Sequence, residues 1–232
     1  MDLIVEGVVQ AFRLIVGGDP EVLGVTLLSL LVSGSATLFS LVVGIPLGTA
    51  LALTSFPGRR FILSLINTGM GLPPVVVGLF VMIMLWRNGP FGFFHILYTP
   101  TAMVIAQAVI ASPIVAGLTA AAIQQLNPRL RLQILALGAS RAQLVWLLMR
   151  EARLPLLAAV MAGFGAVVSE IGASMMVGGN ILDQTRVLTT ATVMETSKGN
   201  FGTAIALSLI LLVLIWLVSF VVTSAQQRSR PR

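Results

Sequence analysis

The sequence predicts an all-α membrane protein with five transmembrane helices and a short amphipathic helix at its N-terminus. Of its 232 residues, 57% are hydrophobic and 9% are charged, and its mean hydropathy is +1.01. Soluble domains carry roughly 25% charged residues. Five segments reach the roughly 20 apolar residues that a helix needs to cross a bilayer. They lie at residues 21–59, 61–86, 98–124, 154–177 and 201–224.

Residues 1–20 precede the first of these segments and predict a separate helix. Its apolar side chains recur every four residues, at Ile4, Val8, Phe12 and Val16. Its polar side chains share the other side, at Glu6, Gln10 and Arg13. This pattern is typical of a helix that lies on a membrane surface. The segment is short and charged for a sixth span, which stays the alternative.

The first span contains GIPLG at residues 44–48. Two glycines four residues apart let another helix approach closely. Pro46 between them predicts a kink.

The second span is interrupted by the adjacent residues Pro73 and Pro74. Two prolines remove two backbone donors, and Pro73 disfavours helix at Leu72. Broken helices occur in membranes where they line a cavity or are buried in protein. Pro73 and Pro74 are therefore candidates for the wall or gate of a translocation path, with a packing kink as the alternative.

Basic residues are distributed unequally between the two sides of this topology. One side carries 10 of the 14 and the other carries 4 (10 + 4 = 14). Because cytoplasmic loops carry an excess of Lys and Arg, the insert at 126–153 and the tail at 226–232 are predicted to be cytoplasmic. The N-terminus is then outside. The same rule explains the net charge of +6 without nucleic-acid binding.

Several chemistries are excluded by residues that the sequence lacks. It has no cysteine, one histidine (His95) and one lysine (Lys198). Thiolate metal sites and sites built on several histidines are therefore excluded. No GxxxxGK[ST] phosphate loop surrounds Lys198. We therefore expect no enzyme, no metal site and no cofactor in this chain.

The insert at 126–153 separates the third and fourth spans and predicts two short helices. The first ends at Gly138, because a glycine past a helix end adopts the left-handed conformation that closes it. Ser140 and Gln143 then fit a capping box at the start of the second. The second helix carries Leu144, Val145 and Leu148 on one face. An apolar face with basic flanks suits a groove on a partner protein, and contact with anionic lipid is the alternative.

Glu170 lies about 16 residues into the fourth span. A carboxylate at mid-membrane costs about 2.5–3.5 kcal/mol on insertion scales, so it needs a partner, water or a proton. A structural hydrogen bond near a gate is the favoured interpretation. Proton coupling and contact with substrate through the protonated form remain open.

The insert resembles the ATPase-coupling loop of type I ABC importer permeases. The resemblance rests on Leu137-Gly138-Ala139-Ser140, the helix that follows and Leu154-Pro155. It implies a type I ABC importer transmembrane domain over 21–225, with 126–153 as its coupling loop. The implied partners are a second permease copy, two ATP-binding subunits that hold ATP and magnesium, and an extracytoplasmic solute-binding protein. The implied ATPase contacts are Leu137, Gly138, Ala139, Ser140, Arg141, Leu144, Val145 and Leu148.

Further motifs resemble the permeases for molybdate, sulfate and above all tungstate. They are LPPVVVG at 72–78, SEIGASMMVGGNI at 169–181 and TRVLTTATVMETSKGNF at 185–201. The resemblance implies a path for an oxyanion, with tungstate first, in a prokaryotic plasma membrane. Hydroxyl candidates along the path are, by residue type and location, Ser169, Ser174, Thr189, Thr190 and Thr192. The rival hypothesis is a self-sufficient secondary transporter or channel that uses Glu170 and the broken second span.

Overall fold

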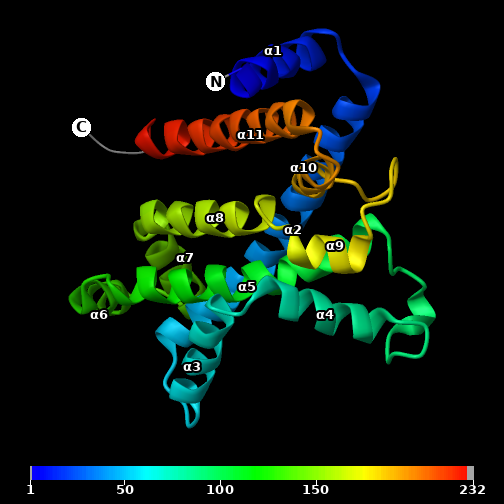
Figure 1. Cartoon of the computed structure of the whole chain (residues 1–232). Coiled ribbons are helices and arrows are strands. Elements are labelled where there is room, and N and C mark those ends of the chain that lie inside the picture. The colour runs from blue at the N-terminus through cyan, green and yellow to red at the C-terminus, as the bar shows by residue number, and fades with distance from the viewer. Residues whose placement is uncertain (1, 229–232) are drawn as a thin grey trace.

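The computed structural model describes the backbone of residues 2–228, and the side chains within that range except residues 2–4, 6, 15–16 and 225–228. The predicted tail continues through residues 229–232, which lie outside the described residues. Eleven α-helices and one short 3-10 helix make up the described chain (Figure 1). In order they are α1 (Asp2–Val16), α2 (Pro20–Leu53), α3 (Arg59–Met70), α4 (Pro74–Leu85), η1 (Gly92–Phe94), α5 (Pro100–Gln124), α6 (Pro128–Ala136), α7 (Arg141–Glu151), α8 (Arg153–Val168), α9 (Gly172–Gly178), α10 (Leu188–Ser197) and α11 (Phe201–Arg228).

The prediction of an all-α membrane protein is confirmed over the described residues. Three of their helices are long and apolar enough to cross a membrane: α2, α5 and α11 up to Ser224. The bent pairs α3–α4 and α7–α8 raise the number to five if each pair counts as one span.

The glycines of the first span make a close contact with the third. A Cβ atom on Gly44 would lie 2.8 Å from the Cβ of Val115. A Cβ on Gly48 would meet the carbonyl oxygen of Ala116 and lie 2.8 Å from the Cβ of Thr119. These two glycines therefore let α2 lie directly on α5, which is the packing that the GIPLG spacing predicts.

The second span is broken into two helices, as Pro73 and Pro74 predict. The chain forms α3 and α4, whose axes meet at 103°. The helix ends at Met70, and α4 begins with Pro74 after Gly71, Leu72 and Pro73. The break itself lies where the sequence places it, because Pro73 and Pro74 have no N–H to continue a helix.

The fourth span is also divided, although the sequence predicts a continuous helix at 154–177. Helix α8 ends at Val168, and a separate helix, α9, starts at Gly172. The carboxylate of Glu170 accepts a hydrogen bond from the N–H of Ala173 at 2.7 Å. A side chain that bonds a backbone N–H in this way starts a helix rather than continuing one.

The N-terminal helix α1 packs against the first turns of α11 (Figure 1). The side-chain nitrogen of Gln10 donates to the hydroxyl of Thr203 at 3.0 Å, and Ala11 is buried. The predicted helix is confirmed, while its position at a membrane surface stays a prediction.

Candidate translocation path and coupling surface

The two breaks come together in space because α4 lies against α9. A Cβ on Gly78 would lie 2.5 Å from the Cα of Ala173, and a Cβ on Gly172 would lie 2.5 Å from a methyl group of Val75. Pro73 precedes α4 as its cap and Pro74 is its first residue. The structure therefore joins the broken second span to the break beside Glu170, two features separated by about a hundred residues of sequence.

Glu170 lies between α8 and α9 and is 6% exposed. Besides the bond from Ala173 to its side chain, its backbone carbonyl accepts the hydroxyl of Thr189 at 3.0 Å. The hydrogen bond from Ala173 gives this buried carboxyl group a partner within the protein. This geometry agrees with the structural interpretation of Glu170.

The five predicted hydroxyl candidates divide by exposure. Ser169 is exposed and donates to the carbonyl of Gly165 at 2.7 Å. Ser174 and Thr190 are fully buried, and Thr189 is 6% exposed. The hydroxyl of Ser174 accepts a hydrogen bond from the side-chain amide of Gln107 at 3.0 Å. The hydroxyl of Thr190 accepts from the N–H of Val187 and donates to its carbonyl, at the start of α10. Thr192 donates to Leu188 and is half-buried. Of these hydroxyls, those of Ser174 and Thr189 connect different elements, whereas those of Thr190 and Thr192 bond within α10 and its cap.

Gln107 is a buried polar residue that the sequence reasoning missed. It lies in the first third of α5, is 2% exposed and connects α5 to α9 through Ser174. Its carbonyl oxygen has no partner among the described residues. The signal was available, because an amide inside an otherwise apolar span marks a functional or packing site.

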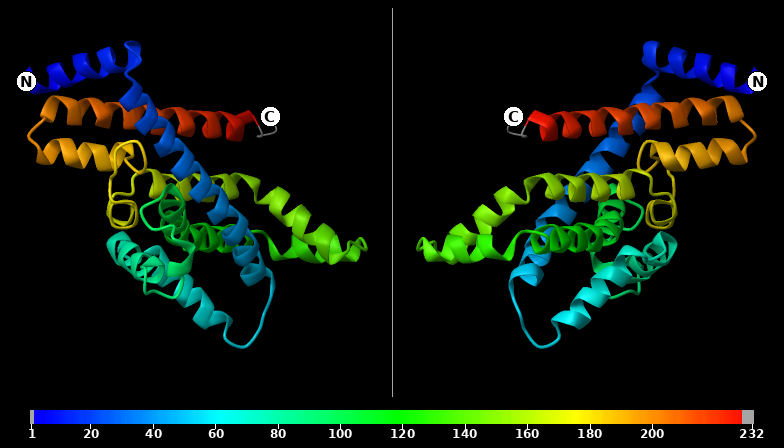
Figure 2. Two further views of the ribbon diagram at one scale, coloured as in Figure 1. Left: turned by 90° about the vertical axis from the view of Figure 1, so that its right-hand side faces the viewer. Right: turned by 90° about the vertical axis from the view of Figure 1, so that its left-hand side faces the viewer.

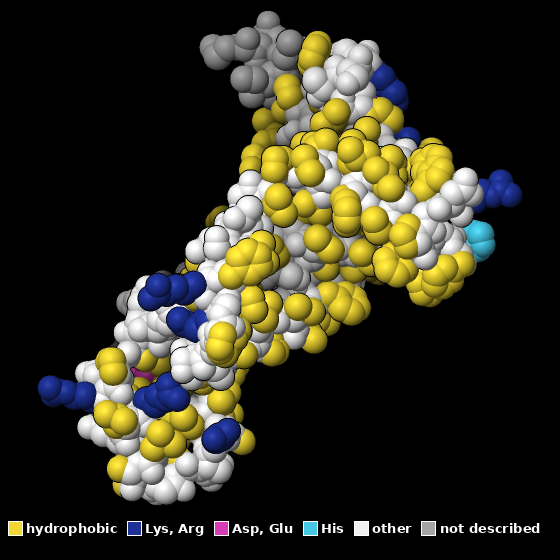
Figure 3. Space-filling model, turned by 90° about the horizontal axis from the view of Figure 1, so that it is seen from below, with side chains coloured by type: hydrophobic (Ala, Val, Ile, Leu, Met, Phe, Trp, Pro, Cys, Tyr) yellow, Lys and Arg dark blue, Asp and Glu magenta, His cyan; other side chains and the backbone are white. Residues whose placement is uncertain are grey.

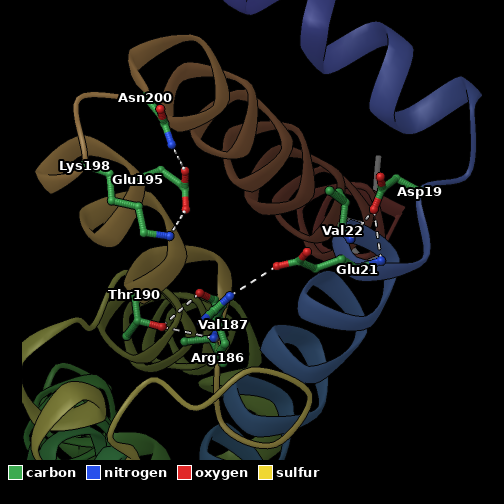
Figure 4. A network of polar contacts seen from close by, with 9 residues as sticks. All are labelled: Asp19, Glu21, Val22, Arg186, Val187, Thr190, Glu195, Lys198 and Asn200. Carbon is green, nitrogen blue, oxygen red and sulfur yellow. Dashed lines mark hydrogen bonds and ion pairs between the residues drawn. The ribbon is translucent and has the colours of Figure 1, made fainter.

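A polar network joins α2, α10 and the loop before α10 (Figure 4). Arg186 pairs with Glu21 at 3.2 Å, and Asp19 caps α2 through the N–H groups of Glu21 and Val22. In the same region Glu195 accepts hydrogen bonds from Asn200 at 2.8 Å and Lys198 at 2.9 Å. The amide of Asn200, and then the ammonium of Lys198, hold the pKa of Glu195 below its ordinary value.

The insert forms the two predicted helices, α6 and α7. Gly138 between them has φ of +81°, so the glycine supplies the left-handed turn. Ser140 and Gln143 form both bonds of the capping box, at 3.3 Å and 2.8 Å. Both views in Figure 2 show α6 and α7 projecting beyond the ends of α2 and α11. The insert is therefore a defined, exposed element.

The apolar face of α7 is used inside the insert, which differs from the groove-docking face predicted for it. Leu144 and Leu148 are 6% and 3% exposed and pack against Ile134 of α6. Val145 and Ala139 are half-buried, and Gly138, Ser140 and Arg141 are exposed. The most exposed apolar side chain at the turn is Leu137, at 88%. Docking by the eight predicted residues stays a prediction, and the exposed ones surround the turn at Gly138.

Basic side chains gather at one end of the molecule, beyond a broad hydrophobic belt (Figure 3). We call this the basic end. Independently of the picture, the side of the predicted topology that carries the excess of basic residues includes Arg59, Arg60, Arg129, Arg131, Arg141 and Arg150. Arg59 also donates to the carbonyl of Leu51 at 2.7 Å, which fixes the turn between α2 and α3. A charged end next to an apolar belt is typical of a protein that crosses a membrane.

Residues 44–232 match the family described as the binding-protein-dependent transport system inner membrane component. The chain belongs to this family of transport permeases. As a permease it is therefore a membrane component of a transport system, and no observation favours the rival secondary transporter.

Permeases of tungstate and molybdenum transport systems are similar to this chain over nearly their whole length. The tungstate uptake system permease protein TupB of Peptoclostridium acidaminophilum is 40% identical over 227 residues, which cover 98% of this chain and 100% of that protein. TupB of Campylobacter jejuni is 35% identical over 221 residues, which cover 95% of this chain and 92% of that protein. The molybdenum transport system permease protein ModB of Escherichia coli K12 is 32% identical, with 86% and 94% covered.

Solved structures support the same fold for this permease. An inward-facing structure of the MetNI methionine ABC transporter matches with a TM-score of 0.74. The match covers 91% of this chain and 97% of that chain, at 20% sequence identity. The fold is therefore that of an ABC importer transmembrane domain.

Proposed function

We propose that this permease forms the path of an ATP-driven importer for a tetrahedral oxyanion, with tungstate as the first candidate. The observation that carries the proposal is the 40% identity to a tungstate uptake permease along 98% of this chain. Tungstate and molybdate are both tetrahedral dianions, and the more distant ModB relatives extend the proposal to that chemical class.

The basic end faces the cytoplasm in this proposal, by the positive-inside rule. The N-terminus, Glu21 and the loop before α10 then lie outside, where a solute-binding protein delivers the anion. Two copies of the permease surround the path, and two separate ATP-binding subunits bind α6 and α7. ATP and magnesium belong to those subunits, and this chain performs no hydrolysis.

A continuous connection leads from the insert to the two breaks. Ala152 is at once the last cap of α7 and the first cap of α8, and it is fully buried. A movement of α7 is therefore passed directly to α8, whose other end is the break at Glu170. Through the contact between Ala173 and Gly78, α9 passes it on to α4. Closure of the ATPases would thus move the region around Pro73 and Glu170 without any chemical step in the permease.

Glu170 has a positioning role in this mechanism. A carboxylate facing a dianion would repel it at close range, and the side chain is already engaged with the N–H of Ala173. Glu170 therefore holds the start of α9 in place beside α4. The anion itself needs neutral hydrogen-bond donors or arginine.

The test is ATP hydrolysis by the assembled complex. The permease is purified with its ATP-binding subunit and placed in lipid nanodiscs with the solute-binding protein. We expect hydrolysis to rise when the binding protein carries tungstate and to stay low with the unloaded protein or with Leu137→Asp. Equal hydrolysis with loaded and unloaded binding protein would contradict the proposal.

A further inference from the structure

Helix α3 carries a polar stripe that the path described so far leaves unexplained. Arg60, Ser64, Asn67 and Thr68 are spaced so that they fall within an arc of about 100° on a helix of 3.6 residues per turn. All four side chains are exposed, and together with Leu63 they line a shallow, open hollow of about 530 Å³. The remaining exposed surface of α3 is apolar and includes Phe61 and Leu65.

The polar groups of these four side chains have no partner among the described residues and can bind a solute. Among the described residues none of them makes a hydrogen bond or an ion pair. Amide and hydroxyl groups lose several kcal/mol when they leave water for hydrocarbon without a partner. A stripe of them along a membrane helix is therefore expected to face water or a polar solute, while Leu65 faces lipid or protein.

The chemistry of the stripe fits an anion. A guanidinium, an amide and two hydroxyls can all donate hydrogen bonds to an oxyanion. No Asp or Glu lies in α3 or lines the hollow, so nothing there repels a dianion. Exposed donors on one wall bind weakly, and weak, repeated binding is what a permeation path requires.

The position of the stripe also fits a path. Thr68 lies two residues before the end of α3 and close to the break at Leu72 and Pro73. Arg60 lies in the first turn of α3, on the side that the predicted topology makes basic. At a rise of 1.5 Å per residue the stripe extends about 12 Å along the helix, from the break to that side.

We propose that Arg60, Ser64, Asn67 and Thr68 form the release path for the oxyanion, from the break before Pro73 to the basic end. The proposal rests on the proposed oxyanion import and assigns residues to its last step. Thr68 and Asn67 receive the anion, Ser64 passes it on, and Arg60 attracts it to the exit.

The chain contains no cysteine, so single thiols can be placed without removing any. Ser64→Cys and Thr68→Cys are compared with Leu65→Cys, a neighbour on another face of α3. Each variant is assembled with its ATPase in inside-out vesicles and treated with a charged methanethiosulfonate reagent. Thiols react as thiolates, which form in water and not in lipid, so we expect the two stripe positions to react about tenfold faster than position 65. Tungstate should slow only the two stripe positions.

Transport measurements add a second readout. Uptake should fall several-fold in Arg60→Gln and Asn67→Leu, recover in Arg60→Lys and stay unchanged in Phe61→Leu. Equal labelling at positions 64, 65 and 68, or labelling that tungstate leaves unchanged in a complex that imports tungstate, overturns the release path alone. A wild-type complex that hydrolyses ATP but imports no tungstate overturns the proposed function, and the oxyanion path with it.

Discussion

Gly78 of α4 and Ala173 of α9 lie so close that a Cβ on the glycine would be 2.5 Å from the Cα of the alanine. Real Cβ atoms essentially never approach another atom this closely. The contact joins the helix that follows Pro73 to the helix that follows Glu170. Any side chain at position 78 must therefore separate the two breaks.

Gly78→Ala should destabilise the permease by about 1–3 kcal/mol, the usual cost of overpacking, and reduce transport. The backbone of Ala173 cannot move aside as a flexible side chain could. Gly34→Ala is the matched control, because Gly34 also lies inside a helix and a Cβ there would meet nothing within 4 Å. It should be neutral or slightly stabilising. Thermal unfolding and tungstate uptake of the two variants check this. Equal melting temperatures and equal uptake would show that the close contact at Gly78 does not matter.

Glu170→Gln should retain transport, since the amide oxygen can still accept the N–H of Ala173. Glu170→Ala should lose about 1 kcal/mol, as other helix caps do on replacement by alanine, and transport with it. The measurement is uptake at several external pH values together with melting temperature. If Glu170→Gln is as inactive as Glu170→Ala, the negative charge or its proton matters, and the positioning role is wrong.

Leu137→Asp and Leu148→Ala should fail for different reasons. Leu137 is 88% exposed at the turn, so its replacement should leave folding unchanged and abolish association with the ATPase. Leu148 is 3% exposed in the small core of the insert, and its truncation should cost about 2–5 kcal/mol. Melting temperature and co-purification of the ATPase separate the two effects. An intact complex with Leu137→Asp would place the docking surface elsewhere.

The corner between α10 and α11 should lose stability in acid. The pKa of Glu195 is lowered by Asn200 and by Lys198, so its contribution is fully present above the ordinary pKa of glutamate and is lost as pH falls through the lowered value. Melting temperature should therefore drop between mildly and strongly acidic pH in the wild type. Asn200→Ala should reduce the drop more than Lys198→Met, and Glu195→Gln should remove this contribution. An unchanged pH profile in all three variants would show that the network is unimportant.

The sequence predicted local features well because each has a local cause. Pro73 and Pro74 end a helix wherever they occur, and Gly138, Ser140 and Gln143 specify a turn and a cap within six residues. Those features lie in the structure where they were expected. Close packing of another helix on Gly44 and Gly48 was also expected, because small residues at this spacing indicate it; the identity of that helix, α5, was not predicted.

The angle of the second span's break, the division of the fourth span and the lining of the path were harder to predict. The two prolines predict a break in the second span but not the angle of 103° between α3 and α4. The break at Glu170 depends on a bond to Ala173 that hydropathy does not register. Burial of Leu144 and Leu148 required knowledge of how α6 folds back on α7, a tertiary relationship that an apolar face on a single helix leaves open.

The most direct measurement is tungstate uptake into vesicles that contain the permease together with its ATP-binding subunit and solute-binding protein. With ATP present and no ion gradient, we predict accumulation of tungstate, and we predict none when the ATPase is omitted. Accumulation driven by a proton gradient in vesicles that contain the permease alone would contradict the proposal.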